Sequence, residues 1–226
     1  MLEVRNLSAW YGSAQALFDV SLQVQAGEML VLQGLNGAGK SSLMQAIMGL
    51  GPRAQGEVWL QGQEISSLAP DRRSRLGLGW VPEDRRLFGE LTVHDNLLLA
   101  ARGPQSANRS SVRSARAAVQ EQLDAVFALF PVLHTMQKRR AAEMSGGEQQ
   151  MLSVARTLMT SPTVLLLDEP CEGIAPVLVE AMVQALLVLR QQGMSMLVAE
   201  QNESVAEAAD RVITLVAGQL AEPATP

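Results

Sequence analysis

The chain has 226 residues, 47% of them apolar and 18% charged, and it carries a formal charge of −5 at pH 7. This length can bury a hydrophobic core and this composition excludes general disorder, while the acidic balance argues against a protein that coats nucleic acid. The single cysteine, Cys171, excludes an intramolecular disulfide and suits a reducing compartment. No apolar run reaches the roughly 18 residues of a membrane helix, and none forms an N-terminal signal, so we expect a soluble cytoplasmic protein.

The N-terminal part of the chain predicts strands that lead into a loop and a helix. Leu2–Trp10 and Leu17–Val24 alternate partly between apolar and polar residues, as strands do, and Tyr11-Gly12-Ser13 forms the turn between them. Met29–Gln33 is a short apolar run typical of a buried strand. From Lys40 to Met48 the pattern becomes helical. Strand, glycine-rich loop and helix in this order are the context that a phosphate-binding loop needs.

The middle of the chain predicts an inserted helical region. Arg102–Ser111 is rich in Gly, Ser and Asn and is expected to form an exposed loop. Apolar residues recur at helical spacing from Val119 to Phe130, and we read the stretch from His94 to about Ala141 as helical. Ser145 is placed to cap a further helix that runs to about Thr160, with Glu148 three residues on, as in a capping box.

The C-terminal part alternates between strands and helices. We expect strands at Val164–Leu167, Met194–Ala199 and Val212–Val216, the last of them the final strand, and a helix near Val177–Gln192. Strands that alternate with helices imply an α/β fold with a mainly parallel sheet.

The segment Gly34–Ser41 reads GLNGAGKS and fits the phosphate-loop pattern G-x-x-x-x-G-K-[ST]. Its glycines let the backbone approach a phosphate closely and turn successive N–H groups toward it at a helix N-terminus. Lys40 places a charge on the terminal phosphates, and the Ser41 hydroxyl can ligate Mg²⁺. The alternative is a chance glycine-rich turn, which the strand and helix on either side disfavour. The positions expected to contact the nucleotide are Gly34, Asn36, Gly37, Ala38, Gly39, Lys40, Ser41 and Ser42.

Two adjacent carboxylates, Asp168 and Glu169, end the apolar run Val164–Leu167. Carboxylates at the end of a buried strand are costly unless something there uses their charge, and a metal-bound triphosphate would. We expect Asp168 to hold Mg²⁺ and Glu169 to act as the general base on the attacking water. The alternative is a solvated strand end with no chemistry.

The segment Ser145–Gln150 reads SGGEQQ and lies between the phosphate loop and the acidic pair. With these three motifs in this order, the chain resembles the ATP-binding-cassette (ABC) ATPases over nearly its whole length. The resemblance implies a P-loop core with an N-terminal antiparallel β subdomain and an inserted α-helical subdomain at about residues 90–160. It implies one nucleotide-binding domain over residues 1–226, with ATP and Mg²⁺ as cofactors and ATP hydrolysis as the activity.

The same resemblance implies roles for three further residues. In ABC proteins a segment like SGGEQQ of one subunit closes over the γ-phosphate held by another subunit, so Ser145 and Gly147 would contact nucleotide in a partner's site. The active enzyme would then be a dimer of two cassettes. Tyr11 lies where the family places an aromatic ring that stacks on adenine, although core packing is the alternative for an aromatic residue there.

Two positions depart from most transport ABC ATPases. Glu83 stands where they have a glutamine that reaches Mg²⁺; a carboxylate can still approach the metal but donates no hydrogen bond when ionised. Gln201 stands where they have a histidine; its amide can donate a hydrogen bond to the γ-phosphate but carries no charge. The loop Cys171–Pro176 also lacks the usual aspartate.

These departures resemble one branch of the family, the second ATPase of branched-chain amino-acid importers. Four segments carry this resemblance: VPEDRRLF from Val81, LTVHDNL from Leu91, EGIAPVLVE from Glu172 and EQN from Glu200. It implies a heterodimer with a second, different ABC ATPase, docked on two membrane permeases at the inner face of the cell membrane. An extracytoplasmic solute-binding protein would be an indirect partner, and nucleic acid would not be one.

Three other functions remain open from the sequence. Similar ATPases serve importers of urea, short amides or other amino acids. An exporter of lipid or lipopolysaccharide would normally retain the histidine that Gln201 replaces. A non-transport ABC ATPase that acts on nucleic acid or ribosomes would normally have two cassettes or long basic insertions. His94 and His134 show no ligand-like spacing and receive no role, and Cys171 is expected to be a small packed residue.

Overall fold

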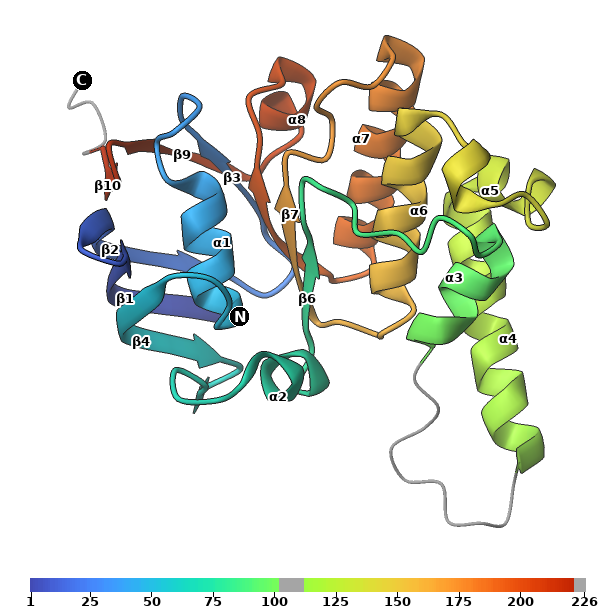
Figure 1. Cartoon of the computed structure of the whole chain (residues 1–226), viewed down its shortest axis with the longest axis horizontal. Coiled ribbons are helices and arrows are strands. Elements are labelled where there is room, and N and C mark those ends of the chain that lie inside the picture. The colour runs from blue at the N-terminus through green and yellow to red at the C-terminus, as the bar shows by residue number, and fades with distance from the viewer. Residues whose placement is uncertain (102–111, 222–226) are drawn as a thin grey trace.

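The strands of the protein form two sheets in a computed structural model that describes residues 1–101 and 112–221. A four-stranded antiparallel sheet has the order β2-β1-β4-β5, and a six-stranded sheet has the order β10-β9-β3-β8-β7-β6 (Figure 1). The strands of the first sheet are β1 (Leu2–Tyr11), β2 (Ala14–Val24), β4 (Arg53–Leu60) and β5 (Gln63–Glu64). Those of the second are β3 (Met29–Gln33), β6 (Leu78–Val81), β7 (Val164–Asp168), β8 (Ser195–Ala199), β9 (Arg211–Val216) and β10 (Gln219–Leu220).

The six-stranded sheet is parallel except for β10, which confirms the predicted α/β fold. Every residue of β7 and β8 is buried, because both faces of the sheet are covered. Alternate residues of β8 enter two different cores: Met196 and Val198 face one, Leu197 and Ala199 the other. Parallel strands covered on both faces read as continuous apolar runs, which is why the sequence located β3, β7 and β8.

One face of this sheet is covered by α1 (Lys40–Met48) and the antiparallel sheet, and α1 contacts both sheets (Figure 1). Helix α2 (Pro70–Arg75) packs near α1 and β6. The other face is covered by α6 (Gly146–Leu158) and α7 (Pro176–Gln191), whose apolar residues share a core with β3 and β7. The short helix α8 (Glu203–Glu207) packs against α7.

The helical region lies at the end of the molecule opposite β1 and β2 (Figure 1). It contains α3 (Val93–Ala100), α4 (Val112–Leu129), α5 (Pro131–Thr135), the 3₁₀ turn η1 (Ala141–Glu143) and α6. Pro131 lies beyond the end of the long helix α4 and opens α5, where its missing N–H is not needed. The capping box at the start of α6 is confirmed: Ser145 and Glu148 each accept the other's backbone N–H. The loop predicted at Arg102–Ser111 lies outside the described residues.

Four strands, β4, β5, β6 and β10, were not predicted from the sequence, and the strand that ends at Val216 is not the final one. In β4 only Val58 and Leu60 are buried, so the strand shows little apolar alternation. Gly56 has φ +115°, and a Cβ there would lie 2.5 Å from the Asn6 carbonyl oxygen, at an irregularity in the pairing with β1. A close backbone approach of this kind requires glycine and is not visible in an apolar pattern.

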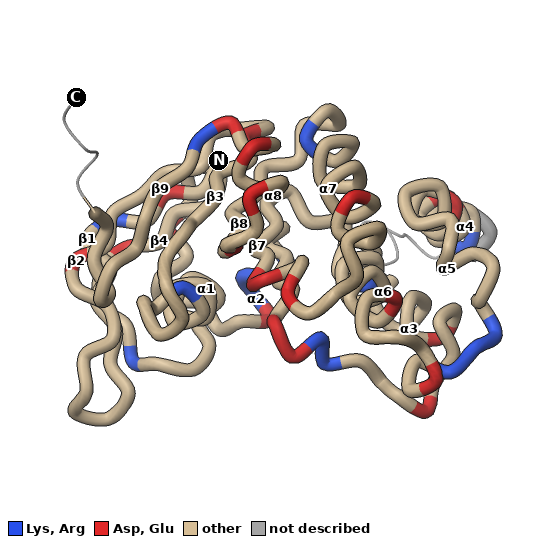
Figure 2. Tube along the Cα trace, turned by 90° about the horizontal axis from the view of Figure 1, so that it is seen from above, with Lys and Arg blue, Asp and Glu red and all other residues tan. Residues whose placement is uncertain are grey.

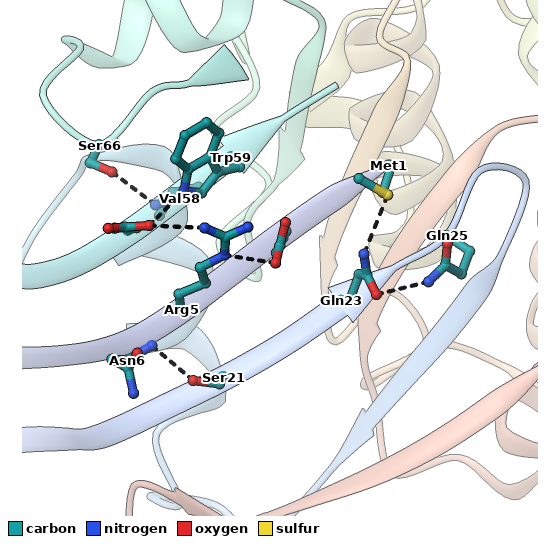
Figure 3. Close-up of polar contacts among 11 residues, drawn as sticks. Met1, Arg5, Asn6, Ser21, Gln23, Gln25, Val58, Trp59 and Ser66 are labelled. Carbon is teal, nitrogen blue, oxygen red and sulfur yellow. Dashed lines mark hydrogen bonds and ion pairs between the residues drawn. The ribbon is translucent and has the colours of Figure 1, made fainter. Parts of the chain in front are cut away.

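Polar contacts tie the strands of the antiparallel sheet together (Figure 3). Arg5 on β1 donates to Glu3 over 2.7 Å and pairs with Glu57 on β4 over 3.4 Å, and its guanidinium lies 5.0 Å from the centre of the Trp59 ring (Figure 3). Because these side chains are largely exposed, each polar contact contributes little to stability. The sheet is stabilised by its apolar face, which packs toward α1.

Asn96 anchors the loop before α3 from inside the helical region. Its side chain is fully buried and accepts from the Phe88 N–H over 3.1 Å. Its amide donates to the carbonyl oxygens of Phe88, Leu91 and Thr92 over 3.0, 3.3 and 3.0 Å. One side chain therefore satisfies backbone groups along the loop that follows Glu83.

We expect Asn96→Ala to lower the free energy of unfolding by about 2–3 kcal/mol, because each buried group left without its partner costs ~1–3 kcal/mol. Urea unfolding followed by circular dichroism measures the loss. Gln120→Ala is the matched control, since that exposed amide bonds only Asp124 on its own helix, and its change should stay within about 0.5 kcal/mol. An equally small change for Asn96→Ala would contradict the anchoring role.

Candidate active site

The phosphate loop joins β3 to α1 in the predicted strand–loop–helix order. Gly39 has φ +108°, and a Cβ there would lie 3.1 Å from Leu17 Cδ2, so glycine is needed both for the backbone and for the space. Gly39 caps α1 without a side-chain hydrogen bond, and the first turn of α1 contains no acidic residue. The N–H groups at this helix start are therefore oriented for an anion.

Lys40 folds back over the loop and is almost completely buried, with 4% of its side chain exposed. Its Nζ donates to the Gly34 carbonyl oxygen over 2.8 Å and pairs with Glu169 Oε1 over 3.0 Å. A buried cation is tolerated here because a carboxylate and a carbonyl both neutralise it. This contact joins the phosphate loop to the segment that follows β7.

Ser41 and Asp168 form the second link between the same two segments. The Ser41 hydroxyl donates to Asp168 Oδ1 over 3.1 Å, and Asp168 is 2% exposed. The pKa of Asp168 is raised to about 6, mainly by burial and also by the charges of Glu169 and Glu83, while the Ser41 hydrogen bond and the charge of Lys40 act in the opposite direction. A hydroxyl and carboxylates near each other are the hard oxygen donors that Mg²⁺ prefers, so these residues fit the metal.

Glu169 has φ +49°, an uncommon backbone conformation for a residue with a side chain. Its N–H donates to the Ala199 carbonyl oxygen over 2.9 Å, and its carboxylate is 11% exposed. Burial raises the pKa of Glu169, but hydrogen bonds from Glu172 and Lys40 outweigh it and bring the pKa below the ordinary value. The same hydrogen bond raises the pKa of Glu172. Glu169 is therefore ionised at neutral pH, as a general base must be.

A cavity of about 330 Å³ brings most of the predicted residues together. Its lining consists of Asn36, Gly37, Gly39, Lys40, Ser41, Ser42, Glu83, Glu169 and Glu172. Gly34, Ala38 and Gln201 line an adjoining cavity of about 630 Å³ that shares Asn36 and Gly37 with the first. Sequence reasoning missed Glu172, although its place three residues after Glu169 was a signal that could have identified it.

Gln201 bridges from the end of β8 to the phosphate loop. Its Nε2 donates to Asn36 Oδ1 over 2.7 Å. Glu200, 4% exposed, fixes this position, because its Oε1 accepts from the Gln201 and Asn202 N–H groups over 2.8 and 3.1 Å. Its other oxygen accepts from the Cys171 N–H over 2.9 Å. Glu200 thus holds both the Cys171 and the Gln201 segments in place, and no role was predicted for it from the sequence.

Cys171 is a packed residue, as predicted. Its side chain is buried, and burial together with the neighbouring Glu200 raises the pKa of the thiol to about 12. The thiol therefore stays protonated and unreactive at neutral pH.

Tyr11 is 48% exposed, which contradicts core packing as the alternative. Its hydroxyl donates to Gln45 Oε1 over 3.1 Å and lies 3.4 Å from Ser42 Oγ, so the ring lies beside the start of α1. Stacking on adenine stays a prediction.

Ser145 and Gly147 lie at the start of α6, and neither lines the cavity that contains Lys40. Gly147 is buried, and a Cβ there would lie 2.4 Å from Leu178 Cδ1, so a larger residue would have to displace the Leu178 side chain on α7. Within one chain the SGGEQQ segment does not complete the phosphate-loop site. This arrangement agrees with the expectation that it serves a second cassette.

The fold and this site define an ATP-binding cassette: a parallel sheet that carries a phosphate loop opposite two strand-end carboxylates. The family model for "ABC transporter" matches residues 17–172, more than half of the chain. The chain belongs to the ABC transporter family and is an ATPase of that family.

Curated relatives match nearly the whole chain. It is 39% identical to the high-affinity branched-chain amino acid transport ATP-binding protein BraG of Pseudomonas aeruginosa over 97% of this chain and 91% of that protein. It is 35% identical to the probable branched-chain amino acid transport ATP-binding protein LivF of Archaeoglobus fulgidus, over 98% of this chain and 90% of that protein. Identity to the lipopolysaccharide export system ATP-binding protein LptB of Haemophilus influenzae is 30% over 100% and 91%.

Solved structures agree with this family. A nucleotide-free ATP-binding cassette from an ABC transporter superimposes with a TM-score of 0.83 at 26% identity, covering 98% of this chain and 90% of that chain. A dimeric bacterial ABC transporter cassette superimposes with a TM-score of 0.79 at 25% identity, covering 98% and 97%. In the described part of this chain, no helix combines the length and apolar character needed to cross a membrane.

Glu169→Gln keeps the size of the side chain and removes its charge. We expect ATP binding to persist while turnover at this chain's site falls about 10²–10⁴-fold, the usual loss when a general base is removed. Phosphate release measures turnover, and a labelled ATP analogue measures binding. Glu172→Gln removes a neighbouring carboxylate from the same cavity and should cost far less; a wild-type rate for Glu169→Gln would reject the assignment.

Proposed function

We propose that this chain is the ATP-hydrolysing subunit of an importer for branched-chain or related amino acids. The hydrolytic role rests on one observation, the convergence of Lys40, Ser41, Asp168 and Glu169 between the phosphate loop and β7. The solute rests on the likeness to BraG and LivF over nearly the whole chain. We infer that residues 1–226 act as one nucleotide-binding domain, with a helical subdomain at about 90–160.

The proposed reaction uses the chain's own groups as follows. N–H groups of the phosphate loop and Lys40 bind the terminal phosphates of ATP. Ser41, Asp168 and Glu83 would hold Mg²⁺, and the metal would supply positive charge to neutralise the phosphates. Glu169 accepts a proton from the water that attacks the γ-phosphorus, and the bond from that phosphorus to the bridging oxygen of ADP breaks. Gln201 donates a hydrogen bond to a γ-phosphate oxygen.

Uptake in the source organism tests the solute. A strain without this chain should lose most uptake of labelled leucine, isoleucine and valine, and the wild-type chain should restore it whereas Glu169→Gln should not. Labelled urea and acetamide serve as parallel probes of the main alternative. Loss of urea or amide uptake with normal leucine uptake would assign the chain to an importer of those solutes instead.

An export function finds less support than import. The lipopolysaccharide export relative covers the chain at 30% identity, below the 39% of BraG. A non-transport ATPase acting on nucleic acid finds no support in the acidic balance of the chain. A chain that co-purifies with ribosomes rather than membrane subunits would favour that function.

We infer a heterodimer with a different ABC ATPase, held by two permeases at the inner face of the membrane. The dimeric cassette among the similar structures supports pairing as such. The argument for two different cassettes is chemical: two copies of this chain would give both sites Glu83 and Gln201. A partner that retains glutamine and histidine would contribute one regular site, completed by Ser145 and Gly147 of this chain.

The purified chain alone should be monomeric or weakly dimeric and slow as an ATPase. Light scattering measures its oligomeric state, and phosphate release measures its rate. Gln201→His should raise the ATP turnover of the assembly modestly, which phosphate release also measures. Gln192→His, which adds an imidazole at the end of α7, is the control for a general effect of histidine. If the isolated chain formed a stable homodimer that hydrolysed ATP as fast as the assembly, this would falsify the unequal-site proposal.

A further inference from the structure

We propose that a cavity in the helical region binds a small oligoanion that carries phosphate groups, at a place separate from the phosphate loop. The cavity has a volume of about 720 Å³, within the range of small-molecule sites. It lies between the start of α3 and the segment after α5 and is lined by His94, His134, Lys138 and Arg139. His94 and His134 are the two histidines of the chain, and both line this cavity although 40 positions separate them in the sequence.

Among the side chains that line this cavity, the fixed charges of Lys138 and Arg139 are both positive. No carboxylate lines it. Among the residues that the structure describes, the side chains of Lys138 and Arg139 have no hydrogen bond or ion pair, whereas the next residue, Arg140, pairs with Glu90 over 3.5 Å. One acid lies beside the cavity without lining it: Asp95 on α3, which accepts the hydroxyl of the lining residue Thr92 over 2.6 Å. Two free cations stand out in a chain of net charge −5.

Backbone contacts fix the two walls of the cavity against each other. The His94 N–H donates to the Gln137 carbonyl oxygen over 3.0 Å, and the Val93 N–H donates to the Arg139 carbonyl oxygen over 2.9 Å. The His134 ring packs edge-on against Phe127, with 5.2 Å between ring centres. The backbone that carries the basic side chains is therefore held in place by hydrogen bonds to the start of α3.

The donor set favours an anion over a metal. In the described part of the chain, no group of three His, Cys, Asp or Glu residues is placed to hold a metal ion. A guanidinium fork and a compact ammonium side by side suit the oxygens of phosphate groups, and the imidazoles add N–H donors. The basic run after α5 lies at the far end of the molecule from β1 and β2 and well away from α1 (Figure 2). A ligand here would be bound independently of ATP.

Histidine-ring NMR tests the proposal site-specifically, because the only two histidine signals of the chain both come from this cavity. Inorganic pyrophosphate is the first probe. We expect both ring signals to shift along one saturable curve, and Lys138→Gln with Arg139→Gln to weaken binding about tenfold or more through the loss of two charged donors. Lys40→Ala should leave the titration unchanged, because the phosphate loop is not involved.

The matched control is the pair Arg72→Gln and Arg116→Gln, which removes two exposed cations elsewhere and should keep the pyrophosphate affinity. Vesicles containing phosphatidylglycerol, compared with phosphatidylcholine alone, form the second arm. Shifts with the charged vesicles but not with pyrophosphate would identify a lipid headgroup as the source of the phosphate. Unchanged ring signals in both arms, or shifts that persist when Lys138 and Arg139 are replaced, would overturn the proposal.

Discussion

The ion pair between Lys40 and Glu169 is the interaction on which the site depends. Both side chains are largely buried, so each is tolerated because the other neutralises it. Three more carboxylates, Glu83, Asp168 and Glu172, lie around this single lysine. A free triphosphate would meet a net negative cavity. This excess of negative charge favours the binding of ATP together with a divalent cation. The cation would neutralise the carboxylates that Lys40 alone cannot neutralise.

Sequence predicted the parts of the fold whose signal is local. The apolar runs of β3, β7 and β8 follow from burial on both faces, and the phosphate loop follows from its glycines and Lys40. Features set by contacts between distant segments were not predictable. Glu200 acts through N–H groups that the fold brings to it, and β4 depends on the close approach of Gly56 to β1. His94 and His134 line one cavity because backbone hydrogen bonds join the start of α3 to the segment after α5.

The segment that carries Glu83 is attached to two helices of the helical region, α3 and α6. Beyond the Asn96 anchor on α3, Arg85 donates from Nε to Gln150 on α6 over 3.0 Å, and its carbonyl oxygen accepts the Ser153 hydroxyl over 3.0 Å. The same helix begins at the SGGEQQ segment. Any displacement of Glu83 by a ligand must therefore be accommodated by α6 or break these bonds, which gives a mechanical link between the phosphate-loop cavity and the SGGEQQ segment.

The Gln201–Asn36 contact also bears on why a site can work with an amide in place of an imidazole. A glutamine amide has two N–H donors on one nitrogen, and the contact with Asn36 occupies one of them. The second N–H remains for a γ-phosphate oxygen, so Gln201 can stay fixed to the phosphate loop while it donates. A histidine in that place could supply positive charge but would use a separate ring nitrogen for each contact. Gln201 thus provides a preset geometry in place of added charge, which agrees with the unequal pair of sites that we propose.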